Sequence, residues 1–401
     1  MNRAGVTGAL FVINACSLIF EVVAARKAAT FLGATAYANS TLLAAFLAGI
    51  GLGGWAAGTS TSDYTRATRR CAILLFAASA FCIVLPAAFS WLTVGGPSSL
   101  TARGFVTVLF VLPVGFSVGL SYPALTALHA EAAGNLGPSV AGTYAADTLG
   151  AASGALLAGL VLIPRLGLQT SAVVAGIGLA AVAASLFTSR SPQSTAHASR
   201  TSRSSASGAA AQLRILFVFF VTGFAALALE VAWVRLFTLV IGTSIFSFSL
   251  TVAAFLAALG LGSQLMRRHV DQFKNPLDVL SVLLILIGTS STALLLLTPV
   301  WERLYLAAYQ AASTVLVFQF VVFGVGLFSI AVPAGLMGAG FSLGVRVLHA
   351  GGSVAARSVG RLYGINTLGG VLGALAAGLL LLPTLGVRGT VLVCSARSLS
   401  E

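Results

Sequence analysis

Long apolar runs alternate with short polar segments along the whole chain. A helix that crosses the hydrocarbon core of a bilayer needs about 20 mostly apolar residues, and runs of this length predict six crossings in each half, the last of them short. The apolar stretch 303–323 would add a further membrane-embedded helix if it formed one. The predicted crossings are 6–26, 36–57, 71–93, 104–127, 141–163, 168–188, 215–235, 244–265, 277–298, 324–345, 362–382 and a segment from 388. We therefore predict an all-α polytopic membrane protein of about 12 transmembrane helices.

The composition agrees with this class. Of the 401 residues, 58% are hydrophobic and 8% are charged, whereas soluble domains carry about 25% charged residues. In a soluble chain the net charge of +13 would suggest a nucleic-acid partner. In a membrane protein the basic residues are topology signals instead, so we expect the lipid bilayer and no nucleic acid as a partner. The four cysteines show no metal-ligand spacing, and we predict neither a metal nor a cofactor.

The sequence contains an internal repeat. Residues 21–53 align with 230–262 without a gap and share 13 identical residues. Further on, YAADTLGAASGALLAGLVLIPRLG from Tyr144 matches YGINTLGGVLGALAAGLLLLPTLG from Tyr363. Two homologous halves are common among transporters. We predict a first six-helix repeat over 1–188, a Ser/Arg-rich linker over 189–212 and a second membrane repeat over 213–401, resembling the major facilitator architecture.

The basic residues predict an orientation in the membrane. With the N-terminus inside, the inner segments carry 14 basic residues and the outer segments carry seven. Cytoplasmic loops are enriched in Lys and Arg. The N-terminus and the central linker are therefore predicted to be cytoplasmic, in a plasma or bacterial inner membrane.

Three acidic residues, Glu21, Asp147 and Glu230, fall inside predicted crossings. A charge at the bilayer centre costs about 2.5–3.5 kcal/mol or more, so such groups usually face the bundle interior. Arg26 and Arg235 each follow a glutamate by five residues, a rotation of about 140° that places them on different faces. The glutamates either line a cavity for a cation such as a polyamine, or brace neighbouring helices while the arginines reach the membrane surface. Duplication copies both kinds of feature, so both hypotheses stay open.

Asp147 has a polar counterpart in the second half, Asn366, and TLG follows each of them. One interpretation is an interhelical hydrogen bond, and the other is a proton or cation site if the aspartate is ionised. With the two glutamates, these residues form the candidate substrate site. His129 and His349 occupy matching ends of crossings, where we expect solvated loop positions.

A short loop motif occurs after the second crossing of each half. Asp63 precedes Arg69 and Arg70 in the first half, and Asp271 occupies a similar place in the second. A glycine-rich helix end followed by Asp and an Arg pair resembles the inner-loop motif of major facilitator transporters. In that motif a carboxylate and arginines tie two helices at the cytoplasmic side, and we assign these residues the same structural role.

Three longer segments resemble a known family. LEVAWVRLFTLVIGTSIFSFSLTVAAFLAALGLGS, LYGINTLGGVLGALAAGLLLLPTLG and AVPAGLMGAGFSL resemble the membrane part of integral-membrane spermidine synthase-like proteins, which combine major facilitator and spermidine synthase parts. The resemblance implies a soluble aminopropyltransferase domain with a glycine-rich nucleotide loop and a catalytic aspartate. Neither motif is present in this chain, whose final crossing reads as truncated, so no catalytic residue is assigned.

The leading hypothesis from the resemblance is a membrane domain that binds or moves a small cationic metabolite such as a polyamine. One alternative is aminopropyltransferase activity with a catalytic domain supplied by another chain. Others are a general secondary transporter and a non-functional fragment.

Overall fold

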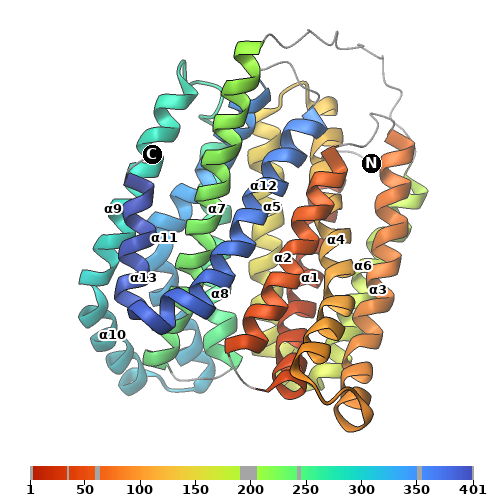
Figure 1. The fold of residues 1–401 in the computed structure, drawn as a ribbon, viewed down its shortest axis with the longest axis vertical. Coiled ribbons are helices and arrows are strands. Elements are labelled where there is room, and N and C mark those ends of the chain that lie inside the picture. Colours follow the sequence, from red (N-terminus) through yellow and green to blue (C-terminus); the bar gives the residue numbers. More distant parts are fainter. Residues whose placement is uncertain are drawn as a thin grey trace.

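The computed structural model describes residues 3–33, 36–58, 64–189, 206–241, 245–349 and 355–399. Throughout these ranges the regular structure is helical, and the helices run roughly along one axis as a bundle (Figure 1). The elements are α1 Arg3–Leu32, α2 Ala36–Gly58, α3 Tyr64–Gly95, α4 Leu100–Ala133, α5 Gly137–Leu156, η1 Leu157–Leu162, α6 Ile163–Thr188, α7 Ala206–Ile241, α8 Ile245–Met266, α9 Pro276–Leu296, α10 Thr298–Ala311, α11 Val315–His349, α12 Ala355–Ala376, η2 Ala377–Leu381 and α13 Leu382–Leu399.

The number of membrane crossings follows from helix lengths and two bends. Within the described ranges, ten helical stretches are long and apolar enough to cross a bilayer. Two of them, Gly137–Thr188 and Ala355–Ser395, have 52 and 41 residues, about twice or more the length of one crossing. Both bend where a glycine has positive φ, 76° at Gly167 and 66° at Gly386, a conformation that glycine adopts readily because it lacks Cβ. The bend at Gly167 leaves enough helix on both sides for two crossings, so Gly137–Thr188 raises the number to eleven. The segment that follows Gly386 and ends at Leu399 is shorter than one crossing, as its sequence predicts.

The stretch 303–323 does not form a crossing of its own. It is divided between α10 and the start of α11. The α10 helix has 14 residues, about 21 Å at 1.5 Å per residue, which is shorter than the hydrocarbon core of about 30 Å. Trp301 of α10 stacks on Phe237 of α7 with ring centroids 5.6 Å apart. This short helix therefore packs against the bundle between two crossings.

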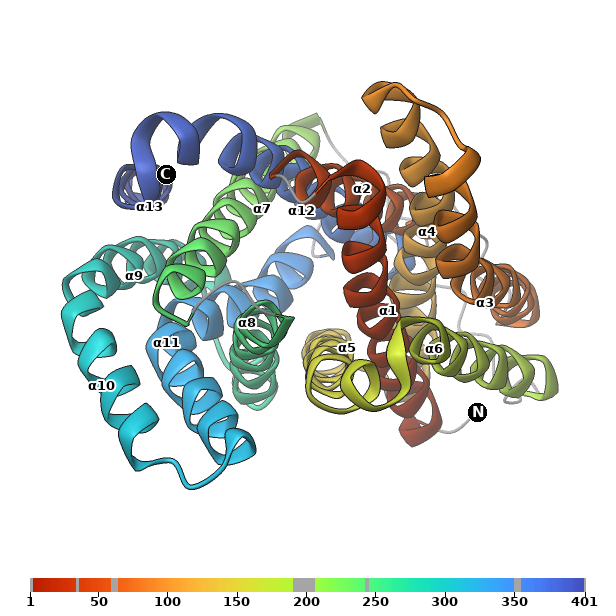
Figure 2. The same cartoon turned by 90° about the horizontal axis from the view of Figure 1, so that it is seen from below.

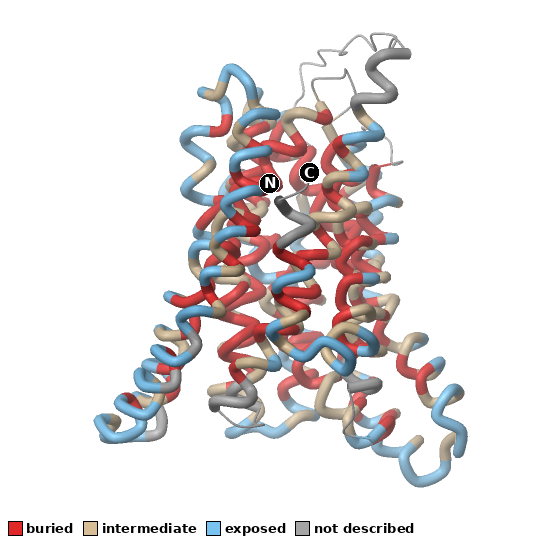
Figure 3. Tube along the Cα trace, turned by 60° about the vertical axis from the view of Figure 1, so that its left-hand side comes forward, coloured by how far each residue is buried: buried red, intermediate tan, exposed pale blue. Residues whose placement is uncertain are grey.

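Seen end-on, helices α1–α6 lie on one side of the bundle and α7–α13 on the other (Figure 2). The two groups meet where α2 packs against α12 and α5 against α8. Of the predicted linker 189–212, residues 206–212 belong to α7, and 190–205 lie outside the described residues. Buried residues run through the middle of the bundle, and exposed ones lie mostly at its periphery and ends (Figure 3). Many exposed side chains are large and apolar, as a lipid-facing surface requires.

The backbones of α1 and α5 touch at two glycines. A Cβ added to Gly150 would overlap the carbonyl oxygen of Phe11, and one added to Gly154 would overlap that of Ala15. Small residues at spacing four allow such an approach where lipid supplies no hydrophobic force between helices. The GxxxG pattern at this pair is therefore a packing device, as its sequence suggests.

The same contact occurs between α7 and α12. Cβ atoms on Gly369 and Gly373 would overlap the carbonyl oxygens of Phe220 and Phe224. These positions are displaced by 219 and 209 residues from those in α5 and α1, the offsets of the aligned blocks. Both pairs of helices therefore meet through equivalent glycines.

We expect Gly154→Ala to lower the stability of the protein, by about 1–3 kcal/mol, because the new methyl group forces α1 and α5 apart. Gly324→Ala is the matched control, since a Cβ there meets no heavy atom within 4 Å. At such a helix-interior position alanine should stabilise by about 0.5–1 kcal/mol. Thermal unfolding of the detergent-purified variants measures both changes. A melting temperature for Gly154→Ala at or above that of Gly324→Ala would contradict the packing role.

Candidate functional site

Glu21 on α1 and Glu230 on α7 both lie inside the bundle, one in each half. Glu21 is 9% exposed and Glu230 is half-buried, and their carboxyl groups lie within electrostatic range of each other. Trp233 follows Glu230 by three residues and so shares its helix face. Its indole N–H is buried and has no hydrogen-bond partner among the described residues. Trp233 thus places an unused donor on the helix face that carries Glu230.

The two arginines predicted to pair or to reach the membrane surface occupy the same helices. Arg26 is half-buried and Arg235 is exposed. Within the described ranges, no hydrogen bond or ion pair joins either of them to Glu21 or Glu230. The brace hypothesis requires hydrogen bonds from neighbouring helices to each glutamate, and the described residues supply none. Both the brace and the cavity-lining hypotheses stay predictions.

Asp147 forms an interhelical hydrogen bond that the sequence predicts in kind but not in partner. Asn14 on α1 donates its side-chain N–H to Asp147 Oδ1 on α5. Both side chains are buried, with exposed fractions of 6% and 5%. Sequence reasoning missed Asn14, although a lone amide inside an otherwise apolar crossing is the signal that could have found it. The pair lies one helical turn from the glycine contact between these helices.

The second half replaces this polar pair with a close backbone contact. Gly223 stands at the position equivalent to Asn14, and a Cβ on it would overlap the carbonyl oxygen of Asn366 and lie 3.0 Å from Asn366 Oδ1. Asn366 is half-buried on α12. The buried acid–amide pair therefore belongs to the first half, and the predicted site residues Asp147 and Asn366 have different surroundings.

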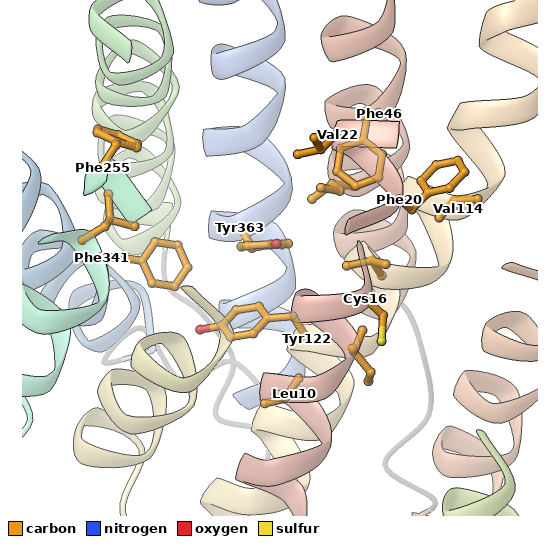
Figure 4. Close-up of a cluster of buried hydrophobic side chains, with 14 of the residues drawn as sticks. Leu10, Cys16, Phe20, Val22, Phe46, Val114, Tyr122, Phe255, Phe341 and Tyr363 are labelled. Carbon is orange, nitrogen blue, oxygen red and sulfur yellow. The ribbon is translucent and has the colours of Figure 1, made fainter. Parts of the chain in front are cut away.

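Four aromatic side chains from α4, α5, α11 and α12 meet between the two halves. The ring centroids of Tyr122 and Tyr363 are 4.7 Å apart, and those of Tyr144 and Phe341 are 4.5 Å apart. Figure 4 shows Tyr122, Phe341 and Tyr363 converging from three helices. All three tyrosines lie within electrostatic range of Asp147. Because ring faces attract cations, this cluster and the acids share a preference for positive charge.

The hydroxyl of Tyr122 is buried without a regular hydrogen bond to any described residue. It lies near the hydroxyls of Thr126 and Thr143, which bond to each other at 3.0 Å. A buried tyrosine hydroxyl normally finds a partner. The hydroxyls of Tyr122, Thr126 and Thr143 therefore form one buried polar group inside the central cluster.

The predicted loop motif is only partly described, because Asp63 lies outside the described residues. Asp271 pairs with Arg346 of α11 at 3.9 Å, and Arg346 Nη1 also donates to the carbonyl oxygen of Phe273 at 3.1 Å. Arg346, which lies outside the predicted loop motif, therefore ties the loop between α8 and α9 to α11. Arg69 and Arg70 are exposed on α3.

No cluster of three His, Cys, Asp or Glu side chains in the described part of the chain is arranged to hold a metal ion. The four cysteines are free and buried, as expected of core residues.

We expect Asn14→Ala to destabilise the protein by about 1–3 kcal/mol, because it leaves the buried Asp147 without its donor. Asp147→Asn should cost less, since its amide oxygen still accepts from Asn14 and a buried charge is removed. Melting temperatures of the purified variants test this order. If Asp147→Asn lost as much stability as Asn14→Ala, the ionised carboxylate itself would be needed for folding.

Comparison with known proteins shows similarity to polyamine aminopropyltransferases over part of the chain. No family model matches the chain. It is 31% identical over 193 residues to polyamine aminopropyltransferase 2 of Streptomyces coelicolor, a match that covers 46% of this chain and 34% of that protein. Polyamine aminopropyltransferase 2 of Ralstonia nicotianae is 30% identical over 187 residues, which covers 46% and 35% respectively. The chain spans about a third of the length of these curated relatives.

Solved structures resemble the chain over nearly all of its length. A human organic anion transporter superposes with a TM-score of 0.63 at 14% identity, covering 100% of this chain and 98% of the transporter. The major facilitator superfamily proton:xylose symporter gives 0.56 at 14% identity and covers 100% and 95%. At this identity the likeness shows the fold alone. The chain is therefore a multi-pass membrane protein with the major facilitator fold and partial homology to polyamine aminopropyltransferases.

Proposed function

We propose that this chain is the membrane part of a spermidine synthase-like protein, and that it binds or moves a small cationic metabolite such as a polyamine. The observation that carries the proposal is that Glu21 and Glu230 lie inside the bundle, one in each half. Their carboxyl groups approach within electrostatic range, and among the described residues neither has a cationic partner. A polycation supplies the missing positive charge.

Electrostatics favours a cationic ligand for this site. Ionised groups inside a membrane protein normally pair with one another or mark a path for substrate. A linear polyamine has ammonium groups separated by short methylene chains, so one molecule can meet two carboxylates at once. The rings of Tyr122, Tyr144 and Tyr363 offer further favourable surfaces for ammonium groups, and Asp147 lies within range of all three. Asn366, on α12 of the second half, packs against Gly223 on α7 of the same half.

The fold supports a transport role within this proposal. Transporters of this class bind substrate between two halves and expose it to each side in turn by rocking one half against the other. We assign the repeats to 1–188 and 213–401, which the equivalent glycine contacts in α1–α5 and α7–α12 support. The excess of basic residues on one side supports a cytoplasmic N-terminus and linker in the plasma or inner membrane.

Two other functions have a specific observation in their favour. The partial identity to polyamine aminopropyltransferases favours a contribution to that reaction, with the catalytic domain supplied by another chain. The fold by itself favours a general secondary transporter. The leading proposal differs from a general secondary transporter because its site specifies a positively charged substrate.

Uptake of radiolabelled spermidine into proteoliposomes tests the proposal. We expect the double variant Glu21→Gln with Glu230→Gln to take up spermidine at least tenfold more slowly, because each substitution removes a counter-charge. Asp278→Asn is the control, since Asp278 is an exposed carboxylate in the first turn of α9.

Thermal unfolding of each variant shows whether it is folded. Unchanged uptake by a folded double variant would refute the cation site. If the double variant failed to fold while Asp278→Asn kept the stability of the wild type, the brace hypothesis would be favoured instead.

A further inference from the structure

A cavity of about 530 Å³ lies at the end of the bundle where α1 begins. It is bounded by the start of α1, the ends of α4 and α8, and the start of α5. Three of its lining side chains are basic, Arg3, His129 and Arg267, and none of the lining residues is acidic. The cavity is therefore positively charged, and it lies between the two halves because α8 belongs to the second.

The basic groups keep hydrogen-bonding capacity that no described residue uses. Arg3 Nη2 donates to the carbonyl oxygen of Ala132 at 2.6 Å, which uses one of the five N–H groups of a guanidinium. The guanidinium of Arg267 packs over α5, where a Cβ on Gly142 would lie 3.1 Å from Arg267 Nε. Within the described ranges, no hydrogen bond or ion pair engages the Arg267 side chain. The unused donors of both arginines border the cavity.

His129 adds a buried polar atom without a partner. Its side chain is 8% exposed and lines the cavity, and Nδ1 forms no hydrogen bond with a described residue. Both arginines lie within electrostatic range of it. The expectation of a solvated loop histidine is wrong here, because α4 continues to Ala133 and buries this residue. A buried ring nitrogen without a partner indicates that a ligand or water completes the site.

We propose that this cavity binds a phosphate-bearing anion. Arg3 and Arg267 are exposed where they border the cavity, so an anion can reach them from outside, and guanidinium groups match phosphate oxygens through paired N–H donors. The hydroxyls of Thr7 and Ser139 already donate to Arg3 O and Asn135 Oδ1, each at 3.1 Å. The arginines and His129 are thus the principal donors. The anion is either a free phosphate or the headgroup of an anionic phospholipid.

This site is separate from the proposed cation site and has the opposite charge. Phe11 lines the cavity, and Asn14 of the Asn14–Asp147 pair lies three residues further along α1. A bound anion contacts Arg3 of the first half and Arg267 of the second, so it ties the halves together at this end. In a protein whose halves rock against each other, that tie favours the conformation that is closed at this end. Anion binding here and cation binding at the central site can each be tested without the other.

The test uses the purified full chain in nanodiscs of phosphatidylcholine, whose headgroup has no net charge. Inorganic phosphate is titrated against chloride at constant ionic strength, and the melting temperature is followed. We expect phosphate to raise it, and Arg3→Gln with Arg267→Gln to weaken the apparent affinity at least tenfold. Arg268→Gln is the matched control, because Arg268 is exposed beside Arg267 and does not line the cavity.

A second arm replaces part of the lipid with phosphatidylglycerol and omits free phosphate. A rise in melting temperature in this arm alone, lost in the double variant, identifies a lipid headgroup as the anion. A rise with inorganic phosphate identifies a free phosphate. The proposal is overturned if neither probe stabilises the wild type, or if the double variant responds as strongly as Arg268→Gln.

Discussion

The close approach of helix backbones in a medium without hydrophobic force is the constraint on which this structure depends. In lipid, apolar side chains gain little by meeting each other, so helices associate where small residues let backbones touch. The contacts of Gly150 and Gly154 bring α1 against α5. Only at that distance can Asn14 reach Asp147. The polar pair therefore depends on the packing, because the glycines set the distance between α1 and α5 that the Asn14–Asp147 hydrogen bond requires.

The same constraint separates two kinds of charge. Acidic groups and tyrosine rings meet inside the bundle, while basic groups gather at one end. In the low dielectric inside the bundle each uncompensated charge is costly, so the acidic cluster requires either a partner within the protein or a ligand, whereas Arg3 and Arg267 are exposed at the end of the bundle. The described residues supply few such partners to Glu21, Glu230 or Arg267. The proposed cation site is therefore central, and the proposed anion site lies at the margin.

Equivalent scaffolds in the two halves carry different chemistry. The glycine contacts recur at equivalent positions, but the acid–amide pair of one half is replaced by Gly223 and Asn366 in the other. A duplicated framework with a single buried aspartate suits one substrate site between two halves. It does not require two copies of the site.

Hydropathy determined that this chain is a bundle of membrane-crossing helices, and isolated charges in apolar runs marked Glu21, Asp147 and Glu230 for attention. Tertiary structure decided which groups meet. Helices that are apolar on every side carry little information about which face turns inward, so the partner of Asn14, the tyrosine cluster and the Arg346 tie could not be predicted. The division of 303–323 between α10 and α11 also depended on packing, because apolarity alone does not say where a helix ends. Crossing a bilayer is a property of one segment, whereas the rotation and partners of a helix depend on all of its neighbours.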